Sequence, residues 1–191
     1  EILRELLISL GFQVERITEE LSVNEKIKNF FVVLKTPLNG RKSNYKHPIS
    51  VFGSEAEKNG FRVVCLFGKT DADRLIDTFK EIGNARNTLV ILDYALTQSD
   101  RRTLARKAKM HTTGKVFAVI DRVAISYLAK HYNETAINRM LMSIIMPFAS
   151  YQPYVVNSGD VMPPEMFIGR KFELQKIEEA KGVNLVYGGR Q

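Results

Sequence analysis

Apolar and polar positions change their spacing in a regular way along the middle of the chain. Short continuous apolar runs, which are typical of buried strands, alternate with segments whose apolar residues recur at helical intervals. The runs predict strands over 61–67, 88–92 and 115–120, and the helical segments are 71–82, 99–110, 123–131 and 136–146. Continuous apolar strands separated by helices are typical of a parallel sheet with both faces covered. We therefore expect a Rossmann-like, three-layer α/β domain with a mainly parallel sheet.

The first fifty residues carry a less regular pattern. Apolar residues at helical spacing predict a helix over 1–10, which Gly11 would end. Short strands are predicted over 12–17 and 30–34. The segment 37–48 is polar, basic and rich in turn-forming residues, so we expect it to connect two elements.

The last part of the chain differs in composition from the rest. Residues 150–164 contain three prolines and a glycine and few helix-forming residues. We expect this segment to be a linker or an extended clamp that follows a domain over 1–149. Beyond it, a helix is predicted over 172–180 and a short apolar strand over 183–187.

Composition indicates a soluble globular protein. The 191 residues are 45% hydrophobic and 26% charged, which argues against wholesale disorder. The single cysteine, Cys65, lies in an apolar run; a disulfide within the chain and a metal site built on thiolates are excluded, and a buried structural thiol is expected. No apolar run reaches the roughly 18 residues of a membrane span and no secretory signal is visible, so we expect a cytoplasmic protein without a membrane partner.

The formal charge of +7 is unevenly distributed. Residues 150–191 balance five acids with five bases, so the excess lies earlier in the chain. The densest basic run has no acid between positions 101 and 115 and comprises Arg101, Arg102, Arg106, Lys107, Lys109 and Lys115. A second cluster lies within 41–47 and comprises Arg41, Lys42, Lys46 and His47. Such clusters bind nucleic-acid phosphates or form a solvated surface. No aromatic residue interleaves the 101–115 bases, which argues against a single-strand stacking platform there.

Gly68-Lys69-Thr70 matches the end of a phosphate-binding motif in its letters alone. A working loop needs a glycine five residues before Gly68, and that position is Val63, inside a predicted strand. No slack backbone is left to surround a phosphate, so we expect Thr70 or Asp71 to cap the following helix instead.

Two acidic residues, Asp93 and Asp121, end successive predicted strands. Carboxylates at this edge of a parallel sheet can hold Mg²⁺, as in a nuclease-like enzyme, or they can cap a helix or pair with Arg101 or Arg122. The acids of a P-D…E-x-K nuclease are not visible. The three histidines have no metal-ligand spacing, so we assign neither a metal site nor a catalytic residue.

The carboxyl-terminal residues hold the most specific pattern. Phe167-Ile168-Gly169-Arg170, followed by Glu173-Leu174, leads through the predicted helix into a strand that ends at Tyr187-Gly188-Gly189-Arg190-Gln191. This order resembles the entry to AAA+/STAND-type P-loop ATPases. The stretch over 117–154 is also similar to a region that precedes the P-loop in large bacterial ATPases.

The resemblance implies a role for each matching residue. Those bordering the adenine base would be Phe167, Ile168, Gly169 and Arg170. Those that begin the phosphate loop would be Gly188, Gly189, Arg190 and Gln191. The Walker A motif reads G-x-x-x-x-G-K-[ST], so the sequence from Gly188 supplies its first four positions, and we expect a longer protein to supply the rest.

Taken together, these features predict the amino-terminal part of a bacterial P-loop ATPase. Residues 1–149 would be a regulatory or recognition domain, and 165–191 would begin the ATPase module. The intact protein would bind ATP and Mg²⁺, whereas this chain would hold neither tightly and would not hydrolyse ATP alone, because the lysine that contacts the phosphates is missing from it. The remaining ATPase chain is the expected partner, and a homo-oligomer stays open. The alternative is a nucleic-acid-binding module that uses the 41–47 and 101–115 clusters.

Overall fold

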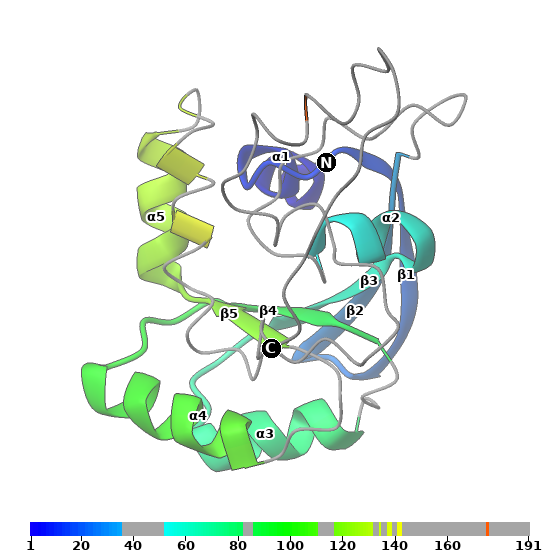
Figure 1. Ribbon diagram of the computed structural model, residues 1–191. Coiled ribbons are helices and arrows are strands. Elements are labelled where there is room, and N and C mark those ends of the chain that lie inside the picture. The colour runs from blue at the N-terminus through cyan, green and yellow to red at the C-terminus, as the bar shows by residue number, and fades with distance from the viewer. Residues whose placement is uncertain are drawn as a thin grey trace, which may run out of the picture.

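A computed structural model gives the α/β architecture of the chain (Figure 1). It describes residues 1–35, 52–81, 86–110 and 117–131, together with positions 134, 137–138, 141–142 and 175. The elements, in chain order, are α1 (Ile2–Ser9), β1 (Val14–Asn24), β2 (Ile27–Leu34), α2 (Ser54–Asn59), β3 (Phe61–Leu66), α3 (Ala72–Glu81), β4 (Thr88–Leu92), α4 (Gln98–Met110), β5 (Phe117–Ile120) and α5 (Arg122–Lys130).

The strands form one mixed sheet in the order β1-β2-β3-β4-β5. The β1–β2 and β2–β3 pairs are antiparallel, whereas β3–β4 and β4–β5 are parallel. β3, β4, β5, α3, α4 and α5 match the predicted elements, and β4 has the predicted bounds. Of the helix predicted over 136–146, the structure describes only 137–138 and 141–142, which are helical. Among the described strands the order runs straight across the sheet, without the reversal that creates the ligand crevice of doubly wound folds.

The antiparallel half is more extensive than the sequence indicated. β1 continues to Asn24, well beyond the predicted 12–17, and pairs with β2 as a hairpin. The short helix α2, which precedes β3, was not predicted. The predicted connection over 37–48 lies outside the described residues, as do 150–164, the strand 183–187 and all of the helix 172–180 except Gln175.

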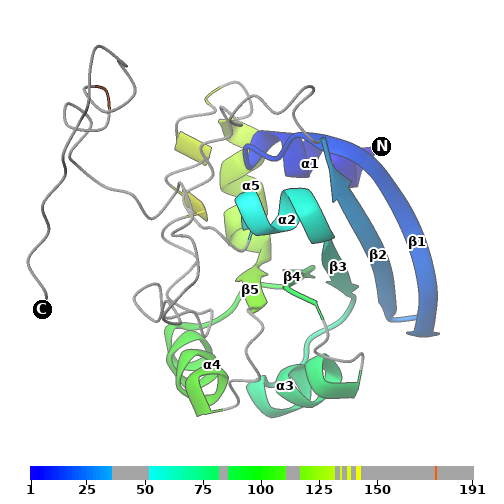
Figure 2. The ribbon, with the colours of Figure 1, turned by 45° about the vertical axis from the view of Figure 1, so that its right-hand side comes forward.

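Helices cover both faces of the sheet (Figure 2). α3 and α4 lie on one face, and α1, α2 and α5 lie on the other. Neighbouring residues of β3 face opposite layers, so Val63 belongs to one core cluster and Val64 to the other. β4 is buried throughout and β3 is buried except at Arg62 and Cys65, which are half-buried, so both strands are rich in apolar residues on both faces.

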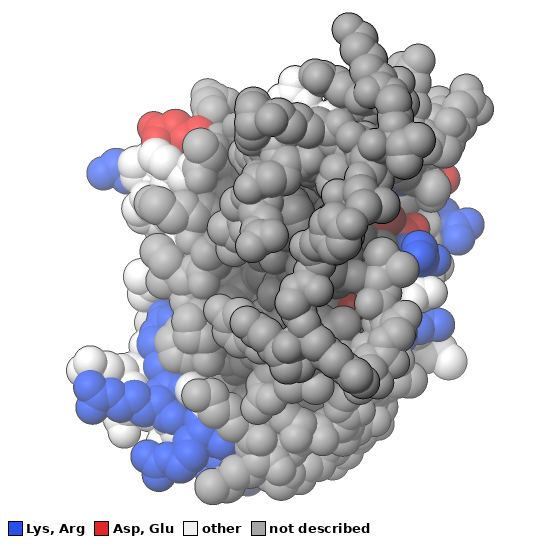
Figure 3. Space-filling model, viewed as in Figure 1, with Lys and Arg blue, Asp and Glu red and all other residues white. Residues whose placement is uncertain are grey.

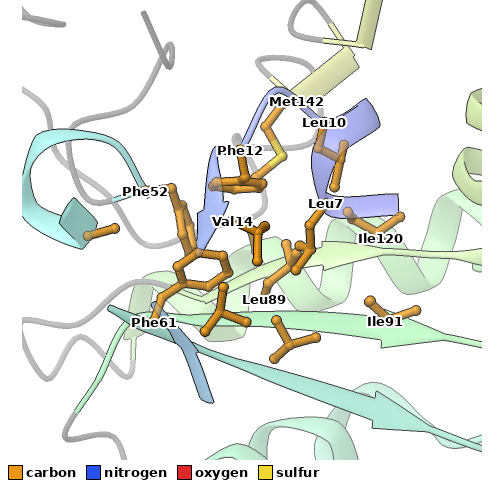
Figure 4. Close-up of a cluster of buried hydrophobic side chains, with 14 of the residues drawn as sticks. Leu7, Leu10, Phe12, Val14, Phe52, Phe61, Leu89, Ile91, Ile120 and Met142 are labelled. Carbon is orange, nitrogen blue, oxygen red and sulfur yellow. The ribbon is translucent and has the colours of Figure 1, made fainter. Parts of the chain in front are cut away.

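Three aromatic rings join the amino-terminal segments to the sheet (Figure 4). The ring centroids of Phe12 and Phe61 lie 4.8 Å apart, and Phe52 meets Phe61 edge to face at 5.4 Å. Leu7 and Leu10 of α1 are fully buried in the same cluster. Tilted and edge-to-face pairs of this kind stabilise a core beyond the area that they bury. The cluster therefore fixes α1 and the turn before α2 against β3.

β1 forms one edge of the sheet and carries charged side chains along it. Exposed residues on this strand include Glu15, Arg16 and Glu19. Glu20 forms ion pairs with Arg86 at 3.0 Å and with Arg62 at 3.5 Å, and the Arg86 guanidinium lies 4.3 Å from the centre of the Phe31 ring. Charges on an edge strand oppose pairing with the edge of another sheet. The ion pairs also connect β1 to β3 and to the start of β4.

Gly60 and Gly68 both have positive φ, but an added side chain would meet different surroundings at the two positions. A Cβ at Gly60 (φ 65°) would lie 2.5 Å from the Val32 carbonyl oxygen, whereas a Cβ at Gly68 (φ 89°) would meet nothing within 4 Å. We expect Gly68→Ala to lower the free energy of unfolding by about 1 kcal/mol through backbone strain alone. Gly60→Ala adds a clash with backbone and should cost about 3 kcal/mol. Urea denaturation of both variants measures the difference, and equal losses would contradict the close approach of β2 at Gly60.

Candidate functional site

The carboxyl ends of the parallel strands are the edge of the sheet at which a ligand site is expected. β3, β4 and β5 end at one edge of the sheet, where they are followed by Gly68, Asp93 and Asp121. Ligands of open α/β sheets bind beyond this edge. The hydrogen bonds of the two carboxylates therefore decide whether the edge has groups available for a ligand.

The Asp121 carboxylate is buried and has several internal donors. It accepts hydrogen bonds from the backbone N–H of Ala124 at 3.1 Å and of Leu96 at 3.0 Å, and it forms an ion pair with Arg101. The first bond caps α5 and the second fixes the segment between β4 and α4. Asp121 is therefore both a helix cap and the partner of Arg101, which are two of the alternatives that the sequence left open. Buried carboxylates are retained in this form because each charge is paired and hydrogen-bonded.

The Asp93 carboxylate is exposed and accepts a hydrogen bond from the backbone just after β3. Both of its oxygens lie 3.0 Å from the backbone nitrogen of Gly68. The Gly68 N–H thus donates to a carboxylate, whose negative charge disfavours a phosphate at the same place. Asp71 caps α3 by accepting from the Arg74 N–H at 2.8 Å. The prediction that Gly68-Lys69-Thr70 precedes a capped helix is therefore confirmed for Asp71.

Tyr94 adds a further bond at the same edge. Its hydroxyl donates to the Thr70 carbonyl oxygen at 2.8 Å. Burial raises the pKa of Tyr94, with smaller contributions from nearby carboxylates. The phenol therefore stays protonated and holds the segment after β3 against the end of β4.

α4 begins with a reciprocal cap. The Asp100 carboxylate accepts from the Thr97 hydroxyl at 2.7 Å and from the Thr97 N–H at 3.2 Å, and the Asp100 N–H donates to the Thr97 hydroxyl oxygen at 3.1 Å. These bonds, led by the hydroxyl, hold the pKa of Asp100 below its usual value. Thr97 caps α4 rather than Ser99, which we would expect as the cap if the helix began at 100, because Thr97 has the acid three residues later that this motif requires.

The basic residues of α4 fall into two groups. Arg101 is paired with Asp121, and Lys107 is paired with Asp73 of α3. Arg102 and Arg106 are exposed, and neither forms an ion pair with any residue in the described ranges. The predicted group Arg101, Arg102, Arg106, Lys107 and Lys109 therefore shares one helix, although the side chain of Lys109 is outside the description.

The predicted nucleotide-binding residues lie outside the described part of the chain. They are Phe167, Ile168, Gly169, Arg170, Gly188, Gly189, Arg190 and Gln191. The 41–47 basic cluster also lies outside it.

Neither a metal-ligand cluster nor a membrane-spanning helix occurs in the residues that the structure describes. Among them, no three His, Cys, Asp or Glu side chains gather in a way that could hold a metal ion. Within the described ranges, none of the helices has the length and apolar character needed to cross a bilayer.

Sequence reasoning missed the polar group on the antiparallel half of the sheet. The register places Glu20 opposite Asn29, and Phe31 opposite Arg62. Asn29 is buried, and its side-chain N–H donates to the Leu21 carbonyl oxygen at 3.2 Å. The pairing of β1 with β2 and of β2 with β3 brings these residues together. The sequence shows only the charged residues of 15–20 in this strand, and these do not identify their partners.

Comparison of this chain with family models, with curated proteins and with solved structures finds no match.

Because Asp121 is buried and ion-paired, removing its carboxylate should destabilise the protein more than removing the exposed carboxylate of Asp93. We expect Asp121→Ala to lower the free energy of unfolding by about 3 kcal/mol, because it removes both the cap of α5 and the buried carboxylate that pairs with Arg101. Asp93→Ala, which removes an exposed carboxylate with a backbone donor, should cost about 1 kcal/mol or less. Chemical denaturation of both variants measures this difference. A smaller loss of unfolding free energy for Asp121→Ala than for Asp93→Ala would contradict the conclusion that Asp121 holds α4 and α5 to the sheet.

The thiol of Cys65 is predicted to be inert in the folded protein. Burial raises its pKa from 9.0 to about 11, and the charge of Lys28 opposes this shift only in part. Because the thiolate is the reactive form, alkylation at pH 8 should be about 100-fold slower in the folded chain than in urea. Mass spectrometry after timed exposure to iodoacetamide measures both rates, and equal rates would show that Cys65 is not held in an apolar setting.

Proposed function

We propose that this chain is the amino-terminal recognition or regulatory region of a P-loop ATPase. The observation that carries the proposal is the order, in the sequence, of Phe167-Ile168-Gly169-Arg170, a predicted helix and a predicted strand that is followed by Gly188-Gly189. Glycines after an apolar strand let the backbone approach a phosphate closely, and a following helix would direct its N–H groups at it. The nucleotide chemistry then belongs to residues from about 165 onward.

The α/β domain supports this division of roles. Asp121 and Asp93, the two carboxylates at the edge where the parallel strands end, already accept hydrogen bonds from the protein itself. Gly68-Lys69-Thr70, the other phosphate-loop candidate, has its glycine N–H directed at Asp93. These contacts favour recognition or regulation over catalysis for the domain, and they leave the carboxyl-terminal motif as the candidate for ATP binding.

The test is to read the gene past Gln191 and to assay the intact product. We expect the next residues to complete x-G-K-[ST] and the product to hydrolyse ATP with Mg²⁺. Replacing the lysine of that completed motif by alanine should lower the rate by at least about 100-fold, because this charge acts on the phosphates in the transition state. Lys69→Ala is the matched control, since it removes the lysine of the other G-K-T sequence, and it should leave the rate unchanged.

Two results would overturn the proposal. A reading frame that stops after Gln191 or continues without the motif removes its basis. A large loss of hydrolysis in Lys69→Ala, with no loss in the motif variant, would place the phosphate site in the α/β domain instead.

A further inference from the structure

The exposed face of α4 carries two arginines one helical turn apart. Arg102 and Arg106 are separated by four residues, so their Cβ atoms lie about 5–6 Å from one another on the same side of the helix. Leu104, which lies between them in sequence, is buried against the sheet. We propose that this face, defined by Arg102 and Arg106, binds the phosphate backbone of double-stranded nucleic acid.

The ion pairs of α4 identify which charges are available. Arg101 and Lys107 are held by Asp121 and Asp73, so much of their charge is compensated within the protein. No acid follows Asp100 in the helix, so Arg102 and Arg106 have no carboxylate neighbour on α4 beyond its first turn. Figure 3 shows Lys and Arg side chains gathered at the lower left of the molecule, where α4 lies in Figure 1.

The composition of this face favours phosphate over other acidic surfaces. Exposed large apolar side chains in the described part of the chain are Ile2, Ile8, Leu21, Phe67, Val123 and Tyr127, and none of them belongs to α4. Protein interfaces are centred on apolar or aromatic anchors, and helices that lie on membranes bury an apolar face. A face with two exposed arginines, on which no exposed large apolar side chain is described, fits a partner whose recognised surface is itself a row of charges.

The same composition predicts how sequence-specific the binding is. α4 has no aromatic side chain on which an unpaired base could stack. Contacts to phosphate position a protein on a duplex but carry no sequence information. Binding through Arg102 and Arg106 is therefore sequence-tolerant and at least as strong for a duplex as for a single strand.

Fluorescence anisotropy with the full chain and a labelled duplex of about 20 base pairs tests the proposal. Two phosphate contacts contribute a log–log salt slope of about 1.8, so raising monovalent salt from about 50 to about 200 mM should weaken this part of the binding about 12-fold. Arg102→Ala/Arg106→Ala should lower the affinity at about 50 mM salt by at least about 10-fold and reduce the slope by about 2.

Lys58→Ala/Lys130→Ala is the matched control. These two lysines are exposed on α2 and α5, which cover the opposite face of the sheet, and their removal changes the net charge by the same amount. The control should bind the duplex with nearly wild-type affinity. Circular dichroism of both double variants shows whether each is folded, and the exposure of all four side chains predicts that both are.

Four results would overturn the proposal. These are no binding of the duplex by the wild-type chain at about 50 mM salt, an equal loss of affinity in the control, a single strand that binds more tightly than the duplex, and tighter binding to phosphatidylserine vesicles. The last would assign the face to a membrane. Because the assay needs neither ATP nor the residues from 165 onward, its outcome is independent of the proposed ATPase role.

Discussion

The buried carboxylate of Asp121 is the interaction on which the parallel half of the fold depends. It follows β5, caps α5, holds the backbone of Leu96 after β4 and pairs with Arg101 of α4. One side chain thus fixes four segments relative to one another at the edge of the sheet. The position of α4, and with it the direction in which Arg102 and Arg106 project, follows from this tie. The exposed basic face and the buried acid are therefore parts of one arrangement.

The parallel half of the fold could be predicted from sequence because its signal is local. β3 and β4 are buried on both faces, so each appears as an apolar run, and the helices between them follow at short distance. The hairpin is different, because β1 is an edge strand with charged residues on its open side. Its apolar content was too low to mark a strand as long as the one that pairing with β2 produces. The charged residues that keep an edge strand from pairing with another chain also lower its apolar content, so the strand is harder to predict from sequence.

The sequence predicted which residue types lie at the candidate site, but not which donors each carboxylate binds. Position and chemistry identified Asp93 and Asp121, but the choice between metal ligand, cap and ion pair depends on which donors the fold brings to each carboxylate. Asp121 and Arg101 lie on different elements and meet only because α4 crosses from β4 to β5. The cap at Thr97 was open to sequence reasoning, since its acid three residues later is the signature of a capping box. The basic run of α4 likewise could not be divided into paired and exposed members without the position of α3.

The contact between α1 and α5 affects the order in which the chain can fold during its synthesis. α1 lies beside α5, and Leu7 and Leu128 belong to one core cluster although they come from opposite ends of this region. A loop of that length is costly in entropy to close before other contacts form, so such pairings are made late in folding. While the chain emerges from the ribosome, β1, β2 and β3 can cover part of the apolar side of α1, but the part that meets α5 stays exposed until α5 has been made. α1 therefore completes its packing later than a helix whose partners are all close in sequence.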